Sequence, residues 1–274
     1  MKNVADIVAQ KSKGRRITVL TAYDYPIASF LDEAGIDIIL VGDSLANVVL
    51  GLKSTTEVGM KEMLYHTGAV ARAAKNSFVV ADMPFEAYQL EGRLAVGNAQ
   101  QLMEAGAKAV KIEWFEDCAD VASAIVRAGI PVMGHVGLTP QTAQDMKVKA
   151  KDAPSARAVI DQALALEESG CFSVVLECIP QEVAEVITRQ LKVPTIGIGA
   201  GPHCDGQVLV VHDLLGLFSR YQPKFSKKYA DLGPRILEAV RTYKKEVTEG
   251  VFPDDAHSFH LPPDEIKKLR SLIE

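Results

Sequence analysis

The 274-residue sequence lacks any apolar run that approaches the roughly 20 residues a membrane-spanning helix requires. Its first residues, MKNVADIVAQKSKGRR, contain no apolar segment resembling a secretory signal. We therefore expect a cytoplasmic protein that does not cross a membrane.

Cysteine is scarce, and positive charge is not concentrated. The four cysteines show no CxxC spacing and no histidine partners at zinc-like intervals, so neither a disulfide framework nor a structural zinc site is indicated. The formal net charge of -5 argues against a nucleic-acid partner, because phosphate backbones require clustered lysine and arginine. Small molecules are the expected ligands.

What is present is a regular alternation of short Val- and Ile-rich runs with longer segments whose apolar residues follow helical spacing. Eight runs read as strands: 17–24, 36–44, 77–84, 108–114, 130–137, 172–180, 193–201 and 207–215. Continuous apolar strands favour a parallel sheet covered on both faces. Eight such units predict a single-domain (β/α)8 TIM barrel over residues 1–274 with a C-terminal helical tail; an open doubly wound sheet is the alternative.

The ends of these strands carry polar side chains: Asp43, Ser44, Asp82, Lys111, Glu113, His135, Glu177, and His212 with Asp213. In a barrel, the C-terminal strand ends converge on one mouth, where catalytic residues lie. Asp43, Asp82 and Glu113 are hard oxygen ligands suited to Mg²⁺. The alternative is that each carboxylate caps the helix that follows it.

Two further features concern the interior of the barrel. Lys111 and Glu113 are two residues apart, so both side chains leave the strand on the same face. Lys111 is either a surface lysine whose charged end reaches solvent or an interior charge that binds an anion. His135 either donates a hydrogen bond or fills the core. Glu177 ends the apolar run SVVLE, either because the strand enters solvent there or because the carboxylate acts in catalysis.

Other polar features have structural interpretations. The run GIGAG, 197–201, lacks GxGxxG spacing and is weak evidence for a nucleotide site. Asp213 reads as the cap of the helix DLLGLF, and His66 as a structural residue on a helix. The Lys-rich segment 142–157 reads as a solvated loop near the mouth.

Several long motifs occur together: TAYDYPIA, VGDSLANVVLG, TTEVGMKEMLYHT, ADMPFEAYQ, VKIE, GHVGLTPQ, LECIP and PTIGIGAGPHCDGQVLVVHDLLGL. Through nearly the whole chain, this pattern resembles the ketopantoate (3-methyl-2-oxobutanoate) hydroxymethyltransferase family. The resemblance implies a homo-oligomer, often a decamer, that transfers a one-carbon unit from 5,10-methylenetetrahydrofolate to 3-methyl-2-oxobutanoate in pantothenate biosynthesis.

The same resemblance implies roles for the residues at the strand ends. Asp43, Asp82 and Glu113 would hold Mg²⁺. Asp43, Ser44, Asp82 and Lys111 would bind the 2-oxo acid, with His135 as a nearby polar contact. Glu177 would accept the proton from C3 of the substrate, which gives an enolate that a divalent cation stabilises.

The sequence departs from the family pattern at two places. Trp114 and Phe115 stand where the family has Gly-Gly, and the segment 142–154 replaces a glycine-bearing loop. The two rings either fill space or narrow the pocket and displace folate. Two alternatives therefore remain: another Mg²⁺-dependent carbon-carbon lyase or aldolase of 2-oxo acids, and a non-catalytic binding paralogue.

Overall fold

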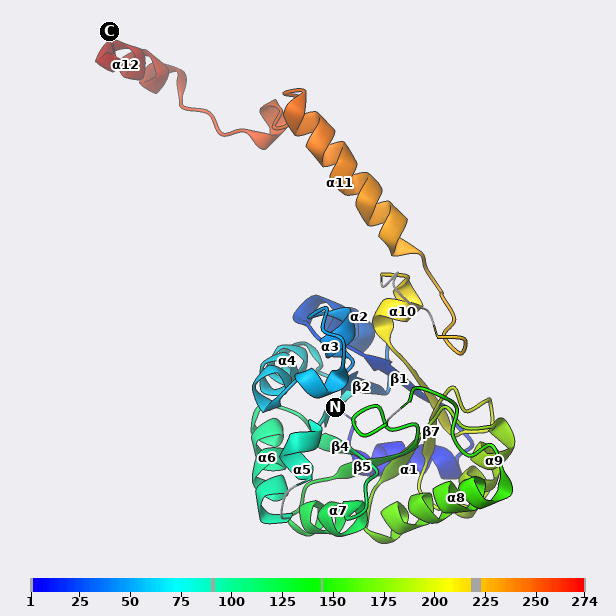
Figure 1. The fold of residues 1–274 in the computed structure, drawn as a ribbon. Helices are drawn as coiled ribbons and strands as arrows, with labels where there is room; N and C mark the ends of the chain where they lie inside the picture. The colour runs from blue at the N-terminus through cyan, green and yellow to red at the C-terminus, as the bar shows by residue number, and fades with distance from the viewer. Residues whose placement is uncertain (1, 90–91, 144, 218–222, 274) are drawn as a thin grey trace.

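The computed structural model describes residues 2–89, 92–143, 145–217 and 223–273. At its centre, eight parallel strands form a closed barrel in sequence order (Figure 1). The predicted (β/α)8 barrel is therefore confirmed, and the open sheet is wrong. The strands are β1 Ile17–Thr21, β2 Ile38–Val41, β3 Phe78–Asp82, β4 Ala109–Glu113, β5 Val132–Gly137, β6 Ser173–Glu177, β7 Thr195–Ile198 and β8 Gly206–Leu209.

Helices surround the barrel and connect most of its strands (Figure 1). The chain from residue 199 to 205 joins β7 to β8 without one. The helices outside the C-terminal tail are α1 Val4–Ser12, α2 Tyr25–Glu33, α3 Leu45–Val48, α4 Met60–Ala73, α5 Phe85–Tyr88, α6 Gly92–Glu104, α7 Cys118–Arg127, α8 Ala153–Glu168, α9 Gln181–Gln190 and α10 Val211–Leu215, with a 3₁₀ turn at Thr55–Glu57.

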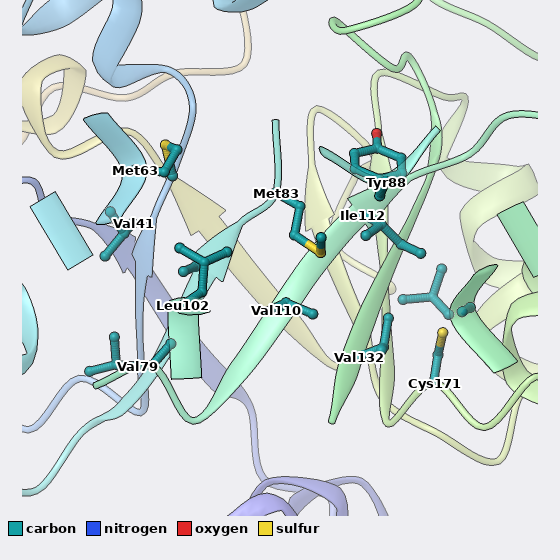
Figure 2. Packing of buried hydrophobic residues seen from close by; sticks show 14 of the residues in the cluster. Val41, Met63, Val79, Met83, Tyr88, Leu102, Val110, Ile112, Val132 and Cys171 are labelled. Atoms are coloured by element: carbon teal, nitrogen blue, oxygen red, sulfur yellow. The ribbon is translucent and has the colours of Figure 1, made fainter. Parts of the chain in front are cut away.

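The core has two layers because successive strand residues point to opposite faces of the sheet. Outward side chains such as Val79 and Val110 pack with Leu102 of α6 and Met63 of α4, as Figure 2 shows. Inward side chains fill the barrel itself, among them Val80 and Met133. Continuous apolar strands are thus explained by burial on both faces, as the sequence predicted.

The N-terminal end of the barrel is closed by α1. Its Ile7 is fully buried and belongs to the same cluster as Ile17, Phe78 and Met133 inside the barrel. Asn3 and Asp6 form a capping box that fixes where α1 begins. With this end closed and apolar, the mouth at the C-terminal strand ends is where polar groups of the barrel interior gather.

Inward alternation carries five of the predicted site residues to that mouth. Asp82 lies two residues beyond the interior Val80, and Glu177 two beyond Val175. Lys111 and Glu113 likewise lie two and four residues beyond the interior Ala109, and His135 lies two beyond the interior Met133. Their inward direction follows from the period of two in a strand.

The observed strands are shorter than the predicted runs, and two boundary errors bear on the mouth of the barrel. The eighth strand ends at Leu209, and both His212 and Asp213 lie in the short helix α10 rather than at a strand end. The predicted loop 142–157 ends early, because α8 begins at Ala153 after Asp152 accepts a hydrogen bond from the Ser155 amide. Residue 144 of this loop lies outside the described residues.

The C-terminal tail extends away from the barrel (Figure 1). It consists of α11 Leu232–Thr248, a 3₁₀ turn at Asp255–His257 and α12 Pro263–Ile273. None of the residues in these elements is buried. Among the described ranges, we find no helix both long enough and apolar enough to span a bilayer.

Candidate active site

Strand register brings the predicted lysine to a carboxylate. Asp82 on β3 lies opposite Lys111 on β4, and their Oδ1 and Nζ atoms form an ion pair at 2.8 Å. Both side chains are almost completely buried. Burial lowers the pKa of Lys111, but attraction from Asp82, Glu113 and Asp43 outweighs this and raises it, so the ammonium stays charged.

A second register pair connects the metal-ligand candidate Glu113 to the base candidate Glu177. Glu113 lies opposite His135 on β5. The imidazole Nδ1 is 3.3 Å from Glu113 Oε1, and its Nε2 is 3.3 Å from Glu177 Oε2. Burial lowers the pKa of His135. The charge of Glu113 and the contacts of the imidazole with Glu113 and Glu177 outweigh this effect and raise the pKa to about 9. A charged His135 therefore lies between two carboxylates.

Asp43 and Ser44 enter the site from the turn after β2. The Asp43 amide donates a hydrogen bond to Asp82 Oδ2 at 3.1 Å, and Ser44 Oγ lies 2.8 Å from the Tyr23 hydroxyl. Burial, followed by repulsion from Asp82 and Glu113, raises the pKa of Asp43 to about 7. The N-cap of the following helix, α3, is Ser44 rather than Asp43, and the Ser44 side chain makes no capping hydrogen bond. The capping alternative for Asp43 is therefore wrong.

Sequence reasoning missed Gln141, which joins the carboxylates together. Its backbone amide donates to Glu113 Oε2 at 2.9 Å, and its side-chain Nε2 donates to Asp43 Oδ2 at 2.8 Å. Its Oε1 accepts a 2.6 Å hydrogen bond from the Tyr88 hydroxyl, which in turn accepts the Glu113 amide. Gln141 closes the motif GHVGLTPQ, but no spacing rule reveals these long-range contacts.

These residues line one cavity of about 550 Å³ at the barrel mouth. Asp43, Ser44, Asp82, Lys111, Glu113, His135 and Glu177 all contribute to its wall. The structure thus brings together every predicted site residue. Glu177 is the most accessible carboxylate in the chain of contacts from Glu113 through His135, with 17% of its side chain exposed. Its position suits contact with a bound small molecule.

The donor set suits a divalent cation at Asp43 and Asp82. Three buried carboxylates face a single lysine, and Asp82 Oδ1 is buried without a hydrogen bond apart from its ion pair. No three His, Cys, Asp or Glu side chains within the described ranges are already arranged to hold a metal. Mg²⁺, however, typically takes one or two carboxylates and completes its shell with water and substrate. The residues present therefore fit Mg²⁺.

The two unusual aromatic residues lie outside the cavity. Trp114 and Phe115 pack against the outer core, and the Phe115 ring meets Phe85 and Tyr88 edge to face with centroids 5.7 Å apart. Neither belongs to the cavity wall in the described part of the chain. The interpretation that they fill space is supported. The altered loop does reach the cavity, through Met146.

The glycine-rich run GIGAG has a packing role. Gly199 has φ of +63°, and a Cβ there would lie 2.8 Å from the ring of Phe225. Glycine at this position therefore allows an aromatic side chain to cross the end of β7 and form part of the cavity wall. His66 is structural as expected, since its Nδ1 contacts the Tyr23 carbonyl at 2.6 Å.

Comparison with known proteins identifies the family. The sequence profile of the family described as ketopantoate hydroxymethyltransferase matches residues 1–255. A 3-methyl-2-oxobutanoate hydroxymethyltransferase from Syntrophobacter fumaroxidans is 53% identical, with 99% of each chain covered. One from Heliobacterium modesticaldum is 51% identical, over 94% of this chain and 95% of the relative.

Solved structures share the fold at low sequence identity. Phosphonopyruvate hydrolase in complex with oxalate and Mg²⁺ superposes with a TM-score of 0.62 at 14% identity, covering 100% of this chain and 96% of the other. A 2,3-dimethylmalate lyase of the PEP mutase/isocitrate lyase superfamily gives 0.61 at 15% identity, with both chains covered completely. These likenesses support the barrel architecture alone.

Proposed function

The chain belongs to the ketopantoate hydroxymethyltransferase family and is a transferase, and from this premise we propose the reaction that its cavity performs. The enzyme joins the one-carbon unit of 5,10-methylenetetrahydrofolate to C3 of 3-methyl-2-oxobutanoate. Water supplies the hydroxyl oxygen, tetrahydrofolate leaves, and the product is 2-dehydropantoate. This product serves pantothenate synthesis.

The substrate acid binds at the cluster formed by Asp43, Ser44, Asp82 and Lys111. Lys111 supplies a buried positive charge for the substrate carboxylate, and the Asp82 contact fixes its position. Mg²⁺ held by Asp43 and Asp82, with Glu113 nearby, would act as a Lewis acid that stabilises negative charge on the keto oxygen. Gln141 keeps Asp43 and Glu113 oriented through its two hydrogen bonds.

Glu177 accepts the C3 proton. The observation that carries this assignment is that its carboxylate lines the same cavity as Lys111 and Asp82 while remaining partly accessible. The Nε2 atom of His135 lies 3.3 Å from Glu177 Oε2 and orients the carboxylate. Removal of the proton leaves a carbanion at C3. Water releases the methylene unit of the folate as formaldehyde, which frees tetrahydrofolate. The carbanion then adds to the formaldehyde carbonyl carbon, and the resulting alkoxide takes up a proton to become the hydroxymethyl group.

Proton NMR of 3-methyl-2-oxobutanoate in D₂O tests this function. With enzyme and Mg²⁺, we expect deuterium at C3 without folate, and 2-dehydropantoate once 5,10-methylenetetrahydrofolate is added. Exchange without product would indicate a lyase or aldolase with another electrophile. No exchange would favour a binding protein, although the packing of Trp114 and Phe115 outside the cavity removes one motive for that alternative.

We also propose that copies of the chain associate. The helix α11 carries exposed apolar side chains at Ile236, Val240, Tyr243 and Val247, which recur at helical spacing and form one stripe. Helix α11 projects from the barrel (Figure 1), and an exposed apolar stripe on such a helix is typical of a surface that another protein chain buries. This supports a homo-oligomer, and the family resemblance implies a decamer. Light scattering of the intact chain should give a molar mass several times that of the 29.6 kDa chain, and a monomer mass would contradict it.

A further inference from the structure

Asp213 is a cavity carboxylate that the proposed chemistry does not use. It lies in α10, directly after β8, and only 8% of the residue is exposed. Its side chain makes no hydrogen bond or ion pair with any residue in the described ranges, yet it contributes to the cavity wall. A nearly buried carboxylate that faces a cavity without a partner is costly unless a ligand pairs with it.

Asp213 is also separate from the other acidic groups. It follows β8, which pairs with β1 and β7, whereas Asp82 and Glu113 end β3 and β4. Burial alone raises the pKa of Asp213, with no contribution from the three carboxylates of the metal cluster. The cap of α10 is Val210, so the earlier interpretation of Asp213 as a helix cap is wrong. Asp213 therefore calls for a different ligand group.

The chemistry of a carboxylate defines that group. Its two oxygens accept two parallel N–H donors, a pairing that is stronger than a neutral hydrogen bond. The 2-oxo acid and Mg²⁺ carry no N–H group. The pterin ring of the folate carries two adjacent donors, the N3 hydrogen and the 2-amino group.

We infer that Asp213 binds the N3 and 2-amino edge of the pterin ring, an assignment that rests on the proposed use of a folate. The same cavity offers apolar walls for the flat ring, from Val48, Leu52, Met146, Pro223 and Phe225. Phe225 is held against Gly199 at the end of β7, next to β8. The folate thus has an aromatic wall and a carboxylate anchor on the β7 and β8 side of the mouth.

The test combines a substitution with a matched change in the ligand. Binding of tetrahydrofolate to the full chain, loaded with Mg²⁺ and 3-methyl-2-oxobutanoate, is measured by calorimetry under anaerobic conditions. Asp213→Asn should weaken binding about tenfold to a hundredfold, because the amide replaces an acceptor with a donor that opposes the pterin N–H group. A tetrahydrofolate analogue with methyl in place of the 2-amino group should lose a similar factor on the wild type. On the Asp213→Asn variant, the analogue should bind only slightly more weakly than tetrahydrofolate does, because the contact is already lost.

Two controls separate this contact from a structural effect. C3 exchange measured without folate should stay at the wild-type rate in Asp213→Asn, because the 2-oxo acid binds elsewhere in the cavity, at Asp82 and Lys111. Asp231→Asn removes an exposed carboxylate beyond α10 and should change neither measurement. If Asp213→Asn does not fold, Asp213→Ser and the analogue on the wild type still provide the comparison.

The outcomes distinguish this inference from the proposed function. Equal affinity of tetrahydrofolate for wild type and Asp213→Asn, in an enzyme that makes 2-dehydropantoate from the folate, would overturn the pterin contact and leave the function standing. A wild type that exchanges C3 but neither binds tetrahydrofolate nor forms product would reject both. The contact is supported if Asp213→Asn binds tetrahydrofolate more weakly than the wild type does, and if changing to the analogue weakens binding to the variant no further.

Discussion

Glu177→Gln should lower the rate of C3 deuterium exchange by about a hundredfold to ten-thousandfold, because the amide cannot accept the proton. The substitution keeps the shape of the side chain, and the amide oxygen can still face His135 Nε2 at the position now held by Oε2. Binding of the 2-oxo acid depends on Lys111, on Asp82 of β3 and on the turn after β2 that carries Asp43 and Ser44. We therefore expect its affinity to stay within about threefold of the wild type.

The decisive comparison is between exchange and binding in the same variant. NMR exchange in D₂O gives the first, and calorimetry of 3-methyl-2-oxobutanoate with Mg²⁺ gives the second. Glu182→Gln, on the exposed face of α9 near the same end of the barrel, is the matched control and should exchange at the wild-type rate. Wild-type exchange in Glu177→Gln would refute the base, whereas parallel losses of exchange and binding would indicate a structural role.

The sequence predicted those parts of the site that depend on strand periodicity. Asp82, Lys111 and Glu177 each lie an even number of residues from an interior apolar residue, so the barrel assignment alone turned them inward. Register then explains the contacts, because Asp82 faces Lys111 on the neighbouring strand. The resemblance supplied the roles, which strand geometry alone does not provide.

The missed features depend on contacts that have no local pattern. Gln141 lies in a turn, and it contacts Asp43 and Tyr88, which are 98 and 53 residues away in the sequence. The end of β8 was misplaced because VLVVHDLL is apolar on both sides of His212 and Asp213, and a short apolar run does not distinguish a strand from a helix. That error hid the direction of Asp213, whose side chain faces the cavity from a helix.

Asp82→Asn should remove Mg²⁺ binding, with an affinity loss of at least about a hundredfold. The ion requires carboxylate charge, and the variant leaves Asp43 as the one remaining carboxylate of the pair. Exchange at C3 should fall with it, since the keto oxygen loses its Lewis acid. Stability should also fall, by about 1–3 kcal/mol for the lost 2.8 Å contact, because the attraction of Asp43 and Glu113 still compensates the charge of Lys111.

A loss of stability alone would also weaken metal binding, and a second ion pair in the barrel separates the two effects. Lys11 and Asp205 meet at 2.8 Å near the N-terminal end, with side chains partly buried. Asp205→Asn should lower the free energy of unfolding without changing the Mg²⁺ affinity. Calorimetry with Mg²⁺ in the presence of the 2-oxo acid, alongside denaturant unfolding, measures both quantities. Unchanged Mg²⁺ affinity in Asp82→Asn would rule Asp82 out as a ligand and move the metal toward Glu113, where Gln141 and His135 already hold the carboxylate in place.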